Sequence, residues 1–184
     1  MRLSKPSIIR EIRENRLSFD PPIRSEQITP SSIDLRLGNK FITFNRKIEE
    51  QAQIGVEIGI DAGSVDWQAF VARYGETSEV PDGGRFTVPP RELVLGWTKE
   101  RISLPDTLAG RVEGKSRLAR IGLLVHVTAP TLQVGWQGDL QLEFYNLGPA
   151  PLILRPDILI CQIILEQVTD RYVHDGVFQH QSSD

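Results

Sequence analysis

The stretch GRVEGKSRLARIGLLVHVTAPTLQVGWQGDLQLEFYN, residues 110–146, is the part of the chain that says most about fold and chemistry. It begins with a short basic segment, Gly114–Arg120, and ends with a strand-like segment in which one carboxylate, Glu143, stands among apolar neighbours. A cluster of cations and backbone N–H donors suits a polyphosphate, and a carboxylate held on a strand suits proton transfer. Both features in one small domain suggest an enzyme that acts on a nucleotide.

The segment Asp139–Tyr145 alternates apolar and polar residues, as a strand with one buried face does. We expect the apolar side chains to lie in the core, namely Leu140, Leu142 and Phe144. The polar side chains should lie on the opposite face, namely Gln141, Glu143 and Tyr145. If the polar face borders a closed pocket, Glu143 loses water and becomes a better proton acceptor, as a general base must be. A solvated glutamate on an outer sheet face fits the same pattern, so both interpretations stay open.

The basic segment Lys115–Arg120 is expected to begin a helix, since helix formers follow Gly114. Ser116 and Arg120, four residues apart, would then lie on one side. A helix start and its cations favour phosphate, although a solvated basic turn is an equal alternative. The segment is not a P-loop, because Ala109 stands where the motif requires its first glycine.

The rest of the chain predicts a mainly β fold. From Arg85 onward, short strand-like runs recur between prolines and glycines, which is typical of an antiparallel sandwich or barrel. These runs are Phe86–Val88, Glu92–Thr98, Leu140–Tyr145, Leu152–Leu154 and Ile158–Glu166. Neither a repeat nor a linker divides the sequence, so we expect a single domain over residues 1–184.

A few helices and turns are expected before Arg85. Their predicted positions are a short helix capped by Ser4 that ends near Asn15, a half-buried strand over Ser32–Gly38 that continues through Phe41–Phe44, a helix from Ser64 to Tyr74 stopped by Gly75, and a turn at Pro81–Gly84. Residues 46–63 are irregular in pattern.

Composition excludes several classes of function. The chain has 184 residues with a net charge of −3, so it does not attract nucleic acid or an anionic membrane as a whole. Its single cysteine, Cys161, excludes an internal disulfide and a cysteine-based zinc site, and we expect it to be a buried, inert thiol. His126, in an apolar run, is expected to be a satisfied core histidine. With neither a signal peptide nor an apolar run of about 18 residues, we expect a cytoplasmic protein.

Taken together, the motifs resemble the dCTP deaminase family, trimeric relatives of dUTPase. Members carry G-[RK]-S-S-L-[AG]-R, H-V-T-A, I-D-P-G-W and L-E-F-Y-N in this order. The matching stretches here are Gly114–Arg120, His126–Ala129, Leu132–Trp136 and Leu142–Asn146, with Met1–Ser4, Ile33–Phe41, Leu154–Pro156 and Gln162 also in agreement. The resemblance implies a distorted, dUTPase-type β-barrel or jelly-roll-like fold with a few short helices.

The resemblance also implies a zinc-independent hydrolysis of dCTP to dUTP and ammonia by a homotrimer. Glu143 would be the base that activates water for attack on C4, with Ser116 and Arg120 as the other catalytic residues. Mg²⁺ would enter with the triphosphate, and no metal would be bound by protein residues alone. The implied substrate-binding residues are Lys115, Ser116, Arg117, Leu118, Ala119, Arg120, Val127, Thr128, Ala129, Gln133, Trp136, Gln141, Leu142, Gln162, Tyr172 and Gln181.

Four positions depart from the family pattern. Arg117 replaces the second serine of the phosphate motif, Thr131 a basic residue, Gln133 the aspartate near the deoxyribose, and Val177 the lysine of the tail that folds over the phosphates. We hypothesise that Arg117 compensates for the lost lysine. Residues from about 173 to 184 are expected to form a mobile tail.

Two alternatives remain. A bifunctional dCTP deaminase and dUTP diphosphatase, or a plain dUTPase, could use the same carboxylate to direct water at the α-phosphate. A low-turnover nucleotide-binding module with a regulatory role would bind nucleotide tightly without releasing ammonia.

Overall fold

The computed structural model describes residues 1–44, 67–171 and 180–181. Its strands are β1 (Ser18–Asp20), β2 (Ile33–Thr43), β3 (Glu76–Glu79), β4 (Phe86–Val88), β5 (Leu93–Ser103), β6 (Leu108–Gly114), β7 (Leu123–Leu124), β8 (Thr131–Leu132), β9 (Gln137–Asn146), β10 (Leu152–Leu154), β11 (Leu159–Gln167) and β12 (His180–Gln181). The helices are α1 (Lys5–Arg13), α3 (Trp67–Tyr74), the one-turn α4 (Ser116–Ala119) and the 3₁₀ turn η1 (Ser25–Gln27).

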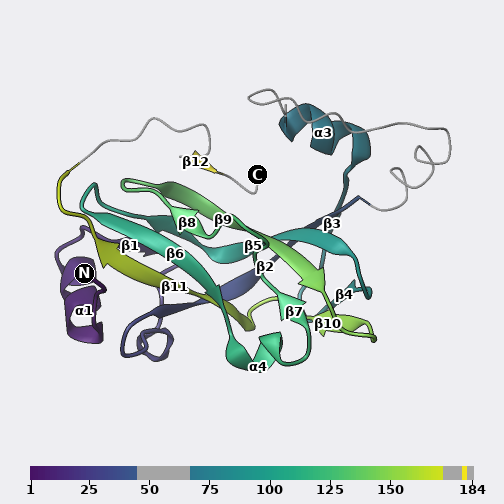
Figure 1. Cartoon of the computed structure of the whole chain (residues 1–184), viewed down its shortest axis with the longest axis horizontal. Coiled ribbons are helices and arrows are strands. Elements are labelled where there is room, and N and C mark those ends of the chain that lie inside the picture. The colour runs from purple at the N-terminus through teal and green to yellow at the C-terminus, as the bar shows by residue number, and fades with distance from the viewer. Residues whose placement is uncertain (45–66, 172–179, 182–184) are drawn as a thin grey trace.

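One large curled sheet dominates the structure (Figure 1). The strand order is β12-β9-β5-β2-β11-β6-β8, with β1 pairing β5, β3 pairing β2 and β7 pairing β9, while β10 and β4 form a separate ribbon. Among the described strands the pairing is antiparallel except that β12 runs parallel to β9. The expectation of a mainly β, largely antiparallel fold with a few helices is confirmed.

β9 has the alternation that its sequence predicts. Leu140, Leu142 and Phe144 are buried in the main core, and Glu143 between them is half-buried on the other face. Helix α1 begins after Ser4, as expected, and contributes Ile8 to the same core. The core therefore fixes the side of β9 on which Glu143 lies.

A smaller apolar cluster lies beneath α3 and includes Phe44, Tyr74 and Trp97. The predicted end of this helix at Gly75 is confirmed, since the Gly75 N–H donates to the Val71 carbonyl at 2.7 Å. The predicted cap, Ser64, lies outside the described residues. The turn at residues 81–84 and the ribbon strands β4 and β10 occur where the sequence predicted them.

The prediction of a half-buried strand at Ser32–Gly38 is wrong, because β2 is buried on both faces from Ile33 to Leu37. The polar positions Asp34 and Arg36 are inside because each has an ionic partner. β2 lies between β5 and β11, so both of its edges are paired as well.

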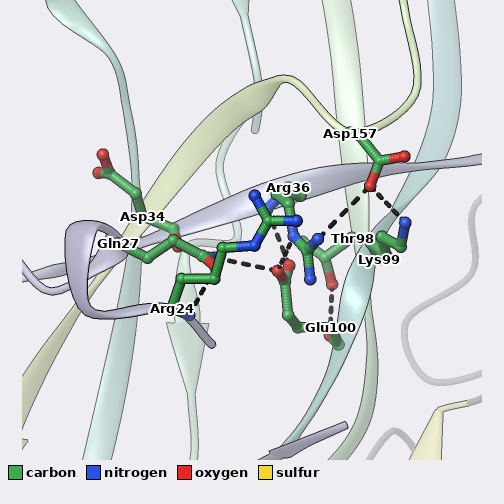
Figure 2. A network of polar contacts seen from close by, with 8 residues as sticks. All are labelled: Arg24, Gln27, Asp34, Arg36, Thr98, Lys99, Glu100 and Asp157. Carbon is green, nitrogen blue, oxygen red and sulfur yellow. Dashed lines mark hydrogen bonds and ion pairs between the residues drawn. The ribbon is translucent and has the colours of Figure 1, made fainter. Parts of the chain in front are cut away.

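Arg36 is held by a buried carboxylate on β5 (Figure 2). The Nε of Arg36 donates to Oε1 of Glu100 at 2.6 Å, and its backbone N–H donates to Oε2 at 2.8 Å. Gln27 of η1 donates to the same carboxylate at 3.0 Å, and Glu100 has no exposed surface. Beyond this centre, Asp157 pairs with Arg36 at 3.6 Å and with Lys99.

β5 extends beyond its predicted end, and β6 was not predicted. β5 runs on through the charged residues Lys99–Arg101, because Glu100 turns inward to Arg36 at an irregularity in the pairing with β9. β6 was missed, since its two glycines weaken a strand pattern. Gly110 leaves room for β11, because a Cβ there would lie 2.7 Å from Cδ1 of Ile163.

None of the described helices is long and apolar enough to cross a membrane.

Replacing Arg36 should destabilise the chain strongly. Arg36→Met leaves Glu100 buried and unpaired, a change that typically costs about 3–5 kcal/mol in the free energy of unfolding. Urea denaturation measures the loss. The matched control is Lys99→Met, which breaks the exposed pair with Asp157 and should cost less than about 1 kcal/mol. Equal losses in the two variants would show that the buried pair has no special role.

Candidate active site

Glu143 is held by the segment that follows β7. Its backbone N–H donates to the Val125 carbonyl at 3.2 Å, and the Val127 N–H donates to its Oε2 at 2.8 Å. Glu143 is half-buried, whereas Val127 is 51% exposed. Glu143 is therefore an oriented carboxylate at the edge of the sheet, and the picture of a freely solvated side chain does not describe it.

The basic segment forms a tight turn between β6 and β7, here called the basic turn (Gly114–Arg120). The N–H groups of Leu118 and Ala119 both donate to the Lys115 carbonyl, at 2.8 and 2.9 Å, and close the single turn of α4. Leu118 packs against the main core and fixes the turn to the body of the protein. The expectation of a helix start is confirmed, although the helix is one turn long.

The exposed face of the basic turn carries Ser116, Arg117, Ala119 and Arg120. Within the described chain, the side chains of Ser116, Arg117 and Arg120 form neither a hydrogen bond nor an ion pair. Two guanidinium groups and a hydroxyl are thus available to an anionic ligand, which suits phosphate.

β7 connects the basic turn to the strand of Glu143. α4 contacts β7, and β7 pairs with β9 through Leu123 opposite Asn146 and Leu124 opposite Tyr145 (Figure 1). The side chain of Asn146 is buried and strengthens this corner, since it donates to the carbonyls of Val88 and Ala150 and accepts from the Gly148 N–H. In the described part of the chain, neither a hydrogen bond nor an ion pair joins Glu143 to Ser116 or Arg120.

Lys115 and Gln162 differ from their neighbours in the predicted site because they already have protein partners. Lys115 forms an ion pair with Asp34, and Gln162 donates to the Gly114 carbonyl at 3.2 Å and accepts from Ser32 at 2.7 Å. Sequence reasoning did not single out Asp34. The sequence signal for Asp34 was its place between apolar residues of β2, which indicates a charge that needs a partner inside the protein.

The remaining predicted residues fall into two groups. Near Glu143, Thr128 and Ala129 are exposed, Gln141 is half-buried and Leu142 is buried. Around the start of β9, Gln133 is exposed, Trp136 is buried, and Gln181 of β12 pairs with Gly138. Gln137 and Glu143 are six positions apart on β9, which is about 20 Å at ~3.3 Å per residue. Tyr172, Val177 and most of the predicted tail lie outside the described residues.

Cys161 and His126 are two other side chains that could take part in chemistry. Cys161 is fully buried, as expected, and this burial raises the pKa of its thiol, which disfavours the reactive thiolate. The expectation of a satisfied core histidine is wrong for His126: the residue is half-buried, and its buried Nδ1 has no hydrogen-bond partner. The described residues contain no cluster of three or more His, Cys, Asp or Glu side chains that could hold a metal.

Comparisons with known proteins find dCTP deaminases among the relatives of this chain. The chain is 39% identical to a dCTP deaminase of Rhodospirillum rubrum over 166 residues, 90% of this chain and 82% of the relative. It is 36% identical to a dUMP-forming dCTP deaminase of Methanobrevibacter smithii over 91% of this chain and 80% of that protein.

The fold also matches a solved structure, the 2′-deoxycytidine 5′-triphosphate deaminase of Agrobacterium tumefaciens. The TM-score is 0.67 at 18% identity, and the match covers 89% of this chain and 47% of that one. At this identity the likeness concerns the fold. The dCTP deaminase-like family matches residues 2–168, so the chain belongs to that family.

Proposed function

We propose that the chain is an enzyme that hydrolyses dCTP to dUTP and ammonia. The observation that carries the proposal is the half-buried Glu143 carboxylate, oriented by the Val127 N–H at 2.8 Å, in a chain so similar to dCTP deaminases. A water molecule attacks C4 of the cytosine ring while Glu143 takes one of its protons and passes it to the ring nitrogen N3. Glu143 then takes the remaining hydroxyl proton and passes it to the amino group, so that the C4–N bond breaks, ammonia leaves and C4 becomes a carbonyl.

Ser116 and Arg120 are proposed to position the water and to stabilise the charge of the tetrahedral intermediate. Their support is their exposure beside β7 and the lack of partners for their side chains within the described chain. The exocyclic amino group of cytosine is a hydrogen-bond donor, so it requires acceptors. The backbone carbonyls of Val127–Ala129 can supply these acceptors, while the Val127 N–H keeps its hydrogen bond to the Glu143 carboxylate.

Phosphate binding is proposed for Lys115, Ser116 and Arg117 of the basic turn, with Leu118 and Ala119 completing its backbone. Mg²⁺ is proposed to enter on the triphosphate, because its preferred ligands are oxygens and the phosphates supply them. Activation of water is then left to Glu143, in a reaction that needs no zinc.

We propose that the site is completed by a second copy of the chain within a homotrimer. The support is a separation of about 20 Å along β9 between the Glu143 group and the group around Gln133, Trp136 and Gln181. Within the described residues of one chain these two groups do not come together. Gln141, Leu142 and Gln162 would edge the nucleotide, and Tyr172 would join from the predicted tail. A cytoplasmic location and a lack of nucleic-acid partners remain part of the proposal.

Glu143→Gln tests the proposed base. The substitution keeps shape and a hydrogen-bond acceptor but removes the ability to take a proton, so we expect kcat to fall ~10²-fold or more. The thermal midpoint and the dissociation constant for dCTP should change little. Ammonia release measures the reaction, and a variant that retained wild-type turnover would exclude Glu143 from the role.

Arg117→Ser tests the hypothesis that this arginine replaces the lysine missing at Val177. Removing a guanidinium that can fork onto phosphate oxygens should raise KM for dCTP by about 10-fold, on the scale of one charge-assisted hydrogen bond, with kcat nearly unchanged. Steady-state kinetics at constant free Mg²⁺ measure the effect. The hypothesis is rejected if KM does not move.

The second candidate function is a bifunctional deaminase and diphosphatase, which the similarity to the dUMP-forming relative favours. Chromatography of the products from dCTP separates the two. We expect dUTP to accumulate, whereas dUMP and pyrophosphate would establish the second activity. Tight binding without ammonia release would instead indicate a regulatory module.

A further inference from the structure

Asp34 is a buried carboxylate with one ionic partner. Its side chain is 9% exposed, and Oδ2 pairs with the Nζ of Lys115, whereas Oδ1 has no hydrogen-bond partner in the described chain. Figure 2 shows the carboxylate pointing away from the Arg36–Glu100 pair. A carboxylate removed from water needs a cation, and Lys115 is the residue that meets this need.

Lys115 in turn holds the start of the basic turn. Its carbonyl accepts the two N–H groups that close α4, while its side chain, 17% exposed, reaches back to β2. The preceding residue is held separately, because Gln162 of β11 donates to the Gly114 carbonyl at 3.2 Å. β2 and β11 therefore fix the two residues that lead into the exposed Ser116, Arg117 and Arg120.

We propose that Asp34 is a positioning residue for nucleotide binding that acts through Lys115. One N–H of the lysine ammonium goes to Asp34, and two remain for phosphate oxygens. The carboxylate thus sets the direction of the lysine and the place of the basic turn without touching the ligand. This inference depends on the proposed function in one respect: the proposed function identifies the bound nucleotide as dCTP.

Because Asp34 is negatively charged, the proposal predicts the direction in which nucleotide affinity changes when the charge is removed. A carboxylate near a triphosphate repels it, so Asp34→Asn would tighten binding if Asp34 had no positioning role. If Asp34 positions Lys115, the same substitution weakens binding instead.

The test measures the dissociation constant of dCTP with Mg²⁺ by calorimetry in a Glu143→Gln background, in which the substrate persists. We expect Asp34→Asn to raise the constant by about 10-fold, and the Asp34→Asn/Lys115→Gln pair to raise it no more than Lys115→Gln alone. With Glu143 intact, Asp34→Asn should raise KM and leave kcat within about 3-fold, a split that a general loss of structure does not produce.

Asp157→Asn is the matched control. It makes the same charge change in another aspartate that pairs with a lysine, Lys99, and at 3.6 Å with Arg36, outside the candidate site. Binding should stay within about 2-fold of the parent, as for surface ion pairs elsewhere.

Two results would overturn the proposal: an unchanged or lower dissociation constant in Asp34→Asn, or effects of Asp34→Asn and Lys115→Gln that multiply independently. If Asp34→Asn alone does not fold, the double variant, which removes both charges, is compared with Lys115→Gln. Equal binding supports the proposal, and binding at least about 5-fold weaker refutes it. Failure of the proposed function is a separate result, namely a wild-type chain that binds dCTP but releases no ammonia.

Discussion

The buried ion pair between Arg36 and Glu100 is the constraint on which the rest of the structure depends. Buried pairs add little net stability compared with apolar residues of similar volume, because both ions lose their hydration. Their effect is on register: a slip of one residue between β2 and β5 would separate the charges and turn every side chain to the opposite face. Thr98, two residues before Glu100, accepts the Leu140 N–H at 3.2 Å and transmits that register to β9. The face on which Glu143 lies follows from it.

The candidate site combines a rigid carboxylate with a set of exposed cations on a short connection. Glu143 stands on a ten-residue strand whose other face is core, so its position is determined by apolar packing. The basic turn has only one helical turn of its own and depends on contacts from other strands, through Leu118, Lys115 and Gly114. Proton transfer needs the first kind of placement, and phosphate binding needs donors that point outward. The fold supplies both within one β6–β7–β9 unit.

The sequence predicted the parts of the molecule that depend on local alternation. The ribbon strands β4 and β10 were predicted to their ends from turn residues around them, and β9 was predicted over Leu140–Tyr145, where its burial alternates, although it begins three residues earlier, at Gln137. Prediction from the sequence failed where contacts between residues far apart in the chain determine the structure. Nothing near Arg36 in the sequence indicates that Glu100 will neutralise it, and nothing near Gly110 indicates that Ile163 will fill its space. Glu143 and the cations of the basic turn were identified by residue type, whereas the engagement of Lys115 with Asp34 is a tertiary fact.

The buried amide of Asn146 has a practical consequence for labelling the protein. It joins Val88, Gly148 and Ala150, so the loop at residues 147–151 has little freedom to accept a dye or a peptide epitope. The turn at 82–83 is a better attachment point: Asp82 is exposed, and the space around Gly83 is open. A fluorophore placed there would leave the corner beside Glu143 undisturbed and could report on the chain during turnover.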